Sequence, residues 1–186
     1  YVRGILCNHW EIHPTGKLRQ VRTKRPVYGY ADPGRYLITR RMVNGRQRLV
    51  SFHRISLETY KPKPHPNLEC DHRDENRKNY AIKNLRWVSH PLNIAFQKHR
   101  GYESYHWKNG TTTYRVRFRN GFWGTYKTPE AARERYLYVR CVWIRNERER
   151  IIRLVMNYNN YTRDEAIDAL NWDIRDDVYF LRELND

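Results

Sequence analysis

The sequence predicts an α+β protein in which two strand-rich parts are each followed by helix. Three features predict this class. Short, partly alternating runs broken by Pro, Gly and Asn-Gly turns fill residues 10–60. A second alternating run, TYRVRFRN over 113–120, precedes the helix start Thr128-Pro129-Glu130. Residues 157–186 place apolar side chains three and four positions apart, as a helix does.

The first strand-rich part is divided by turn signals. A Pro/Gly turn lies in HPTGKLRQV, and an Asn44-Gly45 turn joins the runs PGRYLITRRM and RQRLVSFHRI into an antiparallel hairpin. His53 then falls on the second strand of that hairpin, as a structural or phosphate-facing residue. The prolines of 62–66 predict an extended connection. After it we expect a short strand over 68–71 and the start of a helix over 91–97.

The second strand-rich part alternates apolar side chains with arginines. Tyr114, Val116 and Phe118 fall on one face of the expected strand, because successive side chains of a strand point to opposite faces. The opposite face carries Arg115, Arg117 and Arg119. Asn120-Gly121 predicts a hairpin turn. The helix that begins at Thr128-Pro129-Glu130 is expected to continue to about residue 156.

The charge of the chain is large and unevenly placed. Lys and Arg number 36 against 20 Asp and Glu, which gives a net charge of +16 and a pI near 10.0. From 157 to 186, however, eight acidic side chains stand against three basic ones. Such a division is typical of a nucleic-acid-binding body with an acidic tail. A capping box, Thr162 with Glu165, predicts that the tail is helical, and an assembly partner is one possible ligand for it.

Other classes of protein fit the composition less well. No run of about 18 apolar residues appears, so we expect no membrane partner. No signal peptide is visible, although the chain begins at Tyr1 without Met. Cys7, Cys70 and Cys141 form no CxxC pair, which argues against zinc and against a disulfide framework. Free thiols predict an intracellular, reducing compartment or a virus-associated protein.

The stretch CDHRDENRKNYAIKNLRWVSHPLNIAFQ over 70–97 holds the residue types that phosphodiester hydrolysis needs. A neutral His can deprotonate water, and Asp and Asn oxygens are hard ligands for a magnesium-like ion. The matches DHRDxNxxN and NLRWV make the stretch resemble the HNH endonuclease family, in its homing-endonuclease branch. The resemblance continues upstream to about Trp10, because WEIHPTGKLRQV and the following hairpin are similar to the strand-rich module before such nucleases.

The resemblance implies a role for each matching residue. His72 becomes the general base, and Asn84 orients its ring. Asp71 and Asn93 become ligands of one Mg²⁺ or Mn²⁺, and no zinc is implied. The implied fold is a strand-rich HNH (ββα-metal) nuclease domain over 1–98, and the implied activity is a homing-type DNA endonuclease that nicks or cuts double-stranded DNA.

Downstream, YRVRFRN and WGTYKTPEAARERY are similar to the plant APETALA2/ethylene-response-factor DNA-binding domain. That resemblance implies a three-stranded antiparallel sheet braced by a long helix over 99–156, with the sheet laid on DNA. The acidic helical tail is then 157–186. The residues expected to bind nucleic acid are Arg115, Arg117, Arg119, Lys108 and Phe122.

The chain departs from the HNH pattern at two positions, and a second function stays open because of them. Glu75 stands where Gly is usual, and Tyr80 stands where a second Asn is common. Positive φ costs Gly nothing, whereas Glu would lose about 1 to 2 kcal/mol if the turn required it. The alternative is a catalytically silent nucleic-acid-binding protein of a virion or ribonucleoprotein particle that retains the fold.

Overall fold

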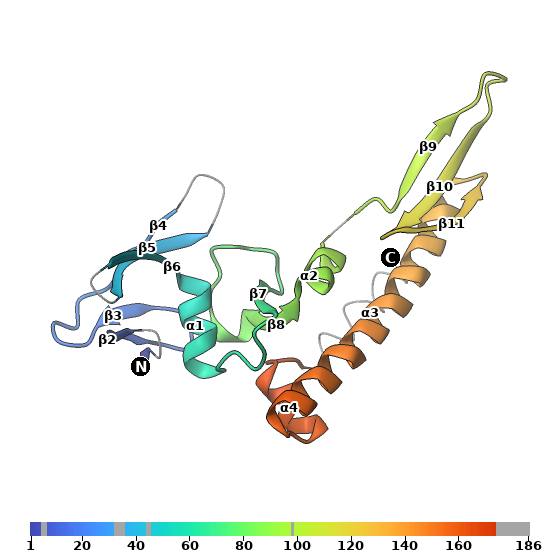
Figure 1. The fold of residues 1–186 in the computed structure, drawn as a ribbon. Coiled ribbons are helices and arrows are strands. Elements are labelled where there is room, and N and C mark those ends of the chain that lie inside the picture. Colours follow the sequence, from blue (N-terminus) through green and yellow to red (C-terminus); the bar gives the residue numbers. More distant parts are fainter. Residues whose placement is uncertain (5–6, 32–35, 44–45, 98, 174–186) are drawn as a thin grey trace. The chain divides into compact units, whose positions relative to one another are not determined.

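The computed structural model describes residues 1–4, 7–31, 36–43, 46–97 and 99–173 (Figure 1). It is an α+β structure with several small antiparallel sheets and one long helix. Two compact units divide it. Unit 1 is Tyr1–His90 with Leu154–Trp172, and unit 2 is Pro91–Arg153 with Asp173–Asp186. These boundaries differ from the expected 1–98, 99–156 and 157–186, since the described tail packs in unit 1.

Unit 1 begins with two three-stranded antiparallel sheets. The first has the order β1-β2-β3, built from Val2–Gly4, Cys7–Ile12 and Leu18–Gln20. The second has the order β4-β5-β6, built from Tyr30–Ala31, Leu37–Val43 and Arg46–Ser51. Val43 pairs with Arg46, as expected for a hairpin at 44–45. The turn itself lies outside the described residues, and so does the Cys7 side chain.

The expected strand over 46–55 is only half right, because the chain turns into helix α1, Phe52–Tyr60. Phe52 and Ile55 are 2% and 1% exposed and join Ile12 and Leu18 in one apolar core. A strand would send Phe52 and Ile55 to opposite faces, whereas a helix brings positions three apart to one side. Burying both against the first sheet therefore favours the helix, and His53 lies on it.

The next elements of unit 1 are the strand pair β7 (Leu68–His72) and β8 (Leu85–Ser89), joined by a loop and the short 3₁₀ turn η1 (Ile82–Asn84). Strand β7 confirms the expected strand at 68–71. The pair is antiparallel, with Asp71 opposite Arg86 and His72 opposite Leu85. Every residue of β8 is buried, including Trp87 at 1% exposure.

The described part of the acidic tail covers β8. Helix α4, Arg163–Ala169, has the expected capping box between Thr162 and Glu165. Beyond it, the Leu170 carbonyl accepts from the Trp87 backbone N–H at 3.0 Å, and Trp172 Nε1 donates to the Trp87 carbonyl at 2.9 Å. Leu170 and Trp172 are 0% and 6% exposed. This tail segment is therefore part of the unit 1 core.

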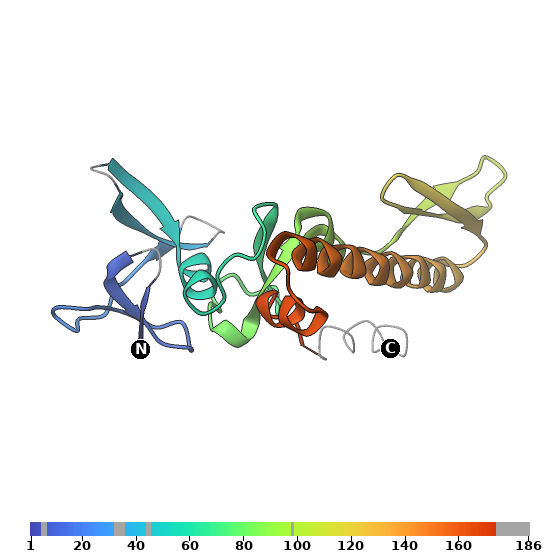
Figure 2. The ribbon, with the colours of Figure 1, turned by 60° about the horizontal axis from the view of Figure 1, so that its bottom comes forward.

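Unit 2 contains helix α2 from Pro91 onward and a three-stranded sheet of order β11-β10-β9. The bounds are α2 His90–Phe96, β9 Tyr102–His106, β10 Thr112–Phe118, β11 Gly121–Tyr126 and α3 Pro129–Asn159. Thr128 Oγ1 accepts from the Ala131 backbone N–H at 3.2 Å, which confirms the expected helix start. The sheet lies along the first turns of α3 (Figure 2), with Val116 buried against Ala132 and Tyr136.

A buried arginine joins α2 to α3 inside unit 2. Arg140 is 2% exposed, and its Nε donates to the Ala95 carbonyl at 2.8 Å. Its Nη2 donates to the Phe96 carbonyl at 3.2 Å. The last carbonyls of a helix have no partner within the helix, so this guanidinium both satisfies them and complements the negative end of α2.

Candidate active site around strands β7 and β8

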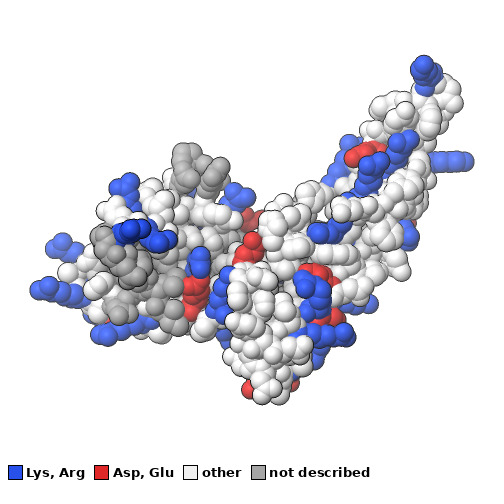
Figure 3. Space-filling view, in the orientation of Figure 1, with Lys and Arg blue, Asp and Glu red and all other residues white. Residues whose placement is uncertain are grey.

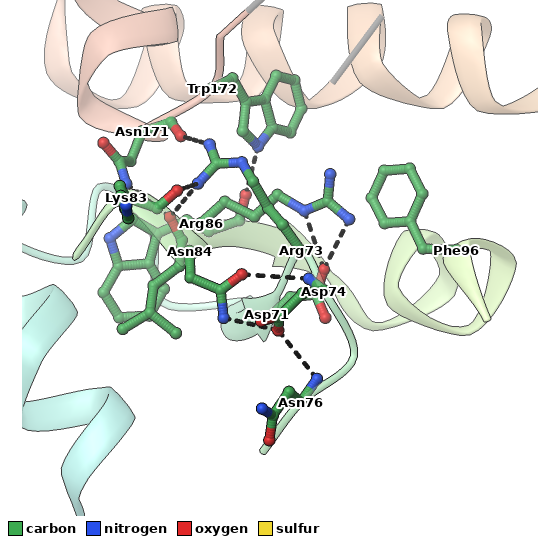
Figure 4. Close-up of polar contacts among 12 residues, drawn as sticks. Asp71, Arg73, Asp74, Asn76, Lys83, Asn84, Arg86, Phe96, Asn171 and Trp172 are labelled. Carbon is green, nitrogen blue, oxygen red and sulfur yellow. Dashed lines mark hydrogen bonds and ion pairs between the residues drawn. The ribbon is translucent and has the colours of Figure 1, made fainter. Parts of the chain in front are cut away.

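Asp71 forms a buried ion pair with the residue directly opposite it in the strand pair. Arg86 Nε and Nη2 each lie 2.9 Å from Asp71 Oδ2 (Figure 4). The two side chains are only 13% and 7% exposed. Burial raises the pKa of Asp71, and the Arg86 guanidinium and the His72 backbone N–H oppose that rise. The carboxylate is thus held in place by a cation before any ligand arrives.

His72 packs in a cluster of rings contributed by α1 and by Tyr36. The His72 and His53 ring centroids are 4.9 Å apart, and the Tyr36 ring lies 4.4 Å from His53 and 5.8 Å from His72. His72 Nε2 and His53 Nδ1 are buried and have no hydrogen-bond partner. Burial lowers the pKa of His72 to about 4 and that of His53 to about 3. Both rings are therefore neutral at pH 7.

The loop after His72 is organised by carboxamides. Asn84 Oδ1 accepts from the Asp74 backbone N–H at 3.1 Å, and Asn84 Nδ2 donates to Asp74 Oδ1 at 2.8 Å and to the Asn79 carbonyl at 2.7 Å. Burial by itself would raise the pKa of Asp74, but hydrogen bonds from Asn79 and Asn84 outweigh it, and the pKa is lowered. Glu75 has φ +58°, the conformation for which Gly is usual.

A second set of bonds fastens the loop to the tail (Figure 4). Arg73 Nη1 donates to the carbonyls of Lys83 at 3.0 Å and Leu85 at 2.7 Å, and Arg73 Nη2 donates to the Asn171 carbonyl. Asn171 Nδ2 in turn donates to the Leu85 carbonyl at 2.6 Å. Sequence reasoning missed Arg73, Arg86, Asn171 and Tyr36. Only one of them could have been found from the sequence: an antiparallel register of β7 with β8 places position 86 opposite Asp71.

The four residues that the HNH resemblance selects do not form one cluster in unit 1. Asp71 and His72 are neighbours on β7, so their side chains leave the strand on opposite faces. Asn84 contacts Asp74 and Asn79, so its expected contact with the His72 ring is replaced by bracing of the loop. Asn93 belongs to α2 in unit 2.

The oxygen atoms of the expected magnesium ligands are suitable donors for that ion, but Arg86 already pairs with one of them, Asp71. In the described part of the chain, no group of three or more His, Cys, Asp or Glu side chains forms a metal cluster. Mg²⁺ uses one or two carboxylates with waters and phosphate oxygens, so an Asp with an Asn is an adequate protein contribution. A cation at Asp71 would compete with the guanidinium of Arg86, which already neutralises the carboxylate.

The residues expected to bind nucleic acid lie in unit 2, and not all share one face. Arg115 and Arg117 are on β10, opposite the core residue Val116. Arg119 lies beyond the strand, with φ +54° and its guanidinium 4.8 Å from the Trp143 ring centroid. The hairpin turn is accordingly Arg119-Asn120, one residue before the expected turn, since Phe118 pairs with Gly121. Lys108 and Phe122 are exposed.

Comparisons with known proteins give one similar structure. The chain matches no protein-family model and no curated protein, so neither the HNH nor the APETALA2/ethylene-response-factor resemblance is supported by a family match. Among solved structures, it is similar to one described as "DNA binding and cleavage by the HNH homing endonuclease I-HmuI", with 13% identity and a TM-score of 0.43. The alignment covers 84% of this chain and 80% of that one.

At this identity and TM-score, the function has to be argued from the chain's own residues. Two further findings bear on the expectations from sequence. No helix among the described residues is long and apolar enough to cross a membrane. Within the same residues, Cys70 and Cys141 are thiols and form no disulfide.

Proposed function

We propose that this chain is a DNA endonuclease of the HNH type, in which His72 is the general base. The observation that carries the proposal is the state of His72. It stands at the end of β7, it is neutral at pH 7 because burial lowers its pKa to about 4, and its Nε2 has no hydrogen-bond partner. A neutral imidazole nitrogen that the fold leaves unused is available to accept a proton.

In the proposed reaction, His72 Nε2 takes a proton from a water molecule as the water oxygen bonds to the phosphorus atom. The bond from phosphorus to the departing sugar oxygen breaks, and that oxygen takes a proton from solvent. The HNH resemblance assigns Asp71 and Asn93 to hold Mg²⁺ or Mn²⁺, which would supply neutralisation of charge on the phosphate and the departing oxygen. Asn84 keeps the 73–81 loop in shape through Asp74 and Asn79. Nε2 is buried, so a water molecule reaches it only when neighbouring side chains shift.

A second function is favoured by a specific observation, the Asp71–Arg86 ion pair. A carboxylate already neutralised by a buried guanidinium binds a cation less strongly than a free one. Together with the left-handed Glu75, this supports a catalytically silent nucleic-acid-binding protein as the alternative. Double-stranded DNA is the proposed partner in both cases, because the chain has 36 Lys and Arg against 20 acidic residues and this positive charge attracts the phosphate backbone.

Nicking of supercoiled plasmid, with and without Mg²⁺ or Mn²⁺, tests the proposal. The wild-type chain should nick only with the metal ion, and His72→Ala should abolish nicking while DNA affinity stays nearly unchanged. Asn93→Ala should be slow but partly restored by more Mg²⁺, whereas Asn84→Ala should be slow without that restoration, because loop geometry is lost. If the wild-type chain binds duplexes of mixed sequence but never cleaves them, the silent alternative holds.

A further inference from the structure

Unit 2 contains a cavity of about 380 Å³ that the proposed chemistry does not use. It lies where the end of α2, the start of β9, the end of β10 and the α3 helix meet. The residues that matter for its chemistry are His99, Arg100, Tyr102, Arg117, Arg119 and Tyr136. Ligand pockets for small molecules begin at about 300 Å³. The cavity therefore has room for one nucleotide.

The wall of this cavity is strongly basic. Arg100, Arg117 and Arg119 are exposed, and within the described residues none of them forms an ion pair with a carboxylate. Glu103 is the acidic residue of the lining, and it stands opposite Arg115 in the β9–β10 pair. Lys and Arg side chains also mark this sheet in Figure 3. Three arginines and a histidine against one carboxylate favour an anionic ligand.

Aromatic rings also line the wall, beside Ile94 and Ala95. The chain crosses Tyr136 so closely that a Cβ on Gly101 would lie 2.2 Å from its ring, so only Gly fits there. The Arg100 guanidinium lies 4.5 Å from the Tyr102 ring centroid, and Phe118 meets Tyr136 edge to face at 5.8 Å. Rings and stacked guanidinium planes next to basic groups are the combination that holds unpaired bases.

We infer that this cavity binds one unpaired nucleotide of a nucleic-acid strand. The pairing of β10 with β9 ends at Val116, so beyond it side chains from both faces of β10 line the cavity. The base lies against Tyr102 and Phe118, and the phosphate is bound by Arg117 and its neighbouring arginines. Glu103 repels phosphate, so the phosphate takes the arginine side. The inference rests on the proposed function only in taking nucleic acid as the ligand. It adds that the second unit recognises an unstacked nucleotide, in addition to the double-stranded backbone.

Binding of nucleoside 5′-monophosphates to the full chain, measured by isothermal titration calorimetry without divalent metal, tests this inference. We expect saturable binding of the monophosphate, with weaker binding of both inorganic phosphate and the unphosphorylated nucleoside. Arg117→Glu should lower the affinity at least about tenfold, because a charge-assisted hydrogen bond is replaced by repulsion. The matched control is Arg133→Glu, an arginine of α3 that is also exposed but lies outside the cavity lining, which should change the affinity little.

A second measurement uses duplexes of equal length. A duplex with one bulged nucleotide should bind more tightly than a fully paired one, and Arg117→Glu should remove that preference. Three results would overturn the inference: no saturable binding of monophosphate, equal effects of Arg117→Glu and Arg133→Glu, or phosphate binding as tight as nucleotide binding. None of these readouts requires cleavage, so a chain that nicks DNA but fails here disproves only the nucleotide site.

Discussion

His53 of α1 and His72 of β7 face each other with ring centroids 4.9 Å apart, and each has a buried ring nitrogen without a partner. Burial lowers the pKa of His53 to about 3 and that of His72 to about 4. In the unfolded chain both would titrate near 6.5. Folding therefore requires both rings to be neutral.

The first prediction is that acid destabilises unit 1 well above the range in which carboxylates titrate. As pH falls below about 6.5, the unfolded histidines take up protons while the folded ones do not, so stability is lost until the folded pKa values are reached. Each histidine should cost about 2 kcal/mol at pH 5. Urea denaturation at pH 7 and pH 5 measures the difference. His53→Phe keeps a ring beside Tyr36 and should remove about half of the difference in unfolding free energy between the two pH values. An unchanged difference in that variant would contradict the role given to the two histidines.

The second prediction concerns the Asp71–Arg86 pair, which is stabilising only while both partners are present. Arg86→Gln should lower the free energy of unfolding by about 3 kcal/mol, because Asp71 is left buried and unpaired. It should also raise the pKa of Asp71 further, because in the wild-type chain the Arg86 guanidinium opposes the effect of burial and the substitution removes it. Chemical denaturation at pH 7 gives the loss. The double variant Asp71→Asn with Arg86→Gln should recover much of it, and a double variant as unstable as the single would refute the pairing argument.

A third prediction uses the backbone of Glu75. With φ +58°, replacement by Gly should relieve a cost of about 1 kcal/mol, whereas Glu75→Ala removes the carboxylate without relieving the backbone. Gly should therefore be more stable than Ala at this position, measured by urea denaturation. Glu75→Gly also distinguishes the two proposed functions, because a loop distorted by Glu75 should gain nicking activity when Gly replaces that residue. Equal stability of the Gly and Ala variants would show that the turn carries no strain.

The fourth prediction is that the acidic tail stabilises the candidate active site. Trp172→Phe keeps an aromatic ring, although a smaller one, but removes the hydrogen bond to the Trp87 carbonyl, at a cost of about 1 kcal/mol. Trp172→Ala also leaves a cavity and should cost about 3 to 5 kcal/mol. Hydrogen exchange of the Trp87 amide, which bonds to Leu170, reports the loss locally. Unchanged protection in the Ala variant would mean that the tail is dispensable for β8.

A fifth prediction concerns the arginines of the β9–β11 sheet. Replacing Arg115, Arg117 and Arg119 together by Ala should flatten the salt dependence of duplex DNA binding by about 0.9 in slope for each phosphate that the protein no longer neutralises. Arg119 stacks on Trp143 and leaves the strand face, so Arg119→Ala alone should change the slope least. Affinity measured across a range of salt concentrations gives the slopes, with Arg133→Ala as the control. An unchanged slope in the triple variant would mean that DNA binds at a surface other than the β9–β11 sheet.

The sequence by itself determined those features that depend on neighbouring residues. The alternation of Tyr114, Val116 and Phe118 fixed a strand with one apolar face, and Thr128-Pro129 fixed the start of α3. The Thr162–Glu165 capping box predicted α4 in the same way. Each of these signals acts within four residues, so no tertiary contact is needed for it to be decisive. The expected strand over 68–71 was confirmed by β7, Leu68–His72.

Only the tertiary structure decided the features that depend on contacts between distant segments. Phe52 and Ile55 became helical because burial against Ile12 and Leu18 outweighed local β propensity. Asp71 pairs with Arg86 because of the strand register, and the His72 ring contacts His53 and Tyr36, which lie about 20 and 36 positions earlier in the chain. Trp172 reached Trp87 across 85 positions. Burial in those contacts lowers the pKa of both histidines, and burial is a property that no local pattern carries.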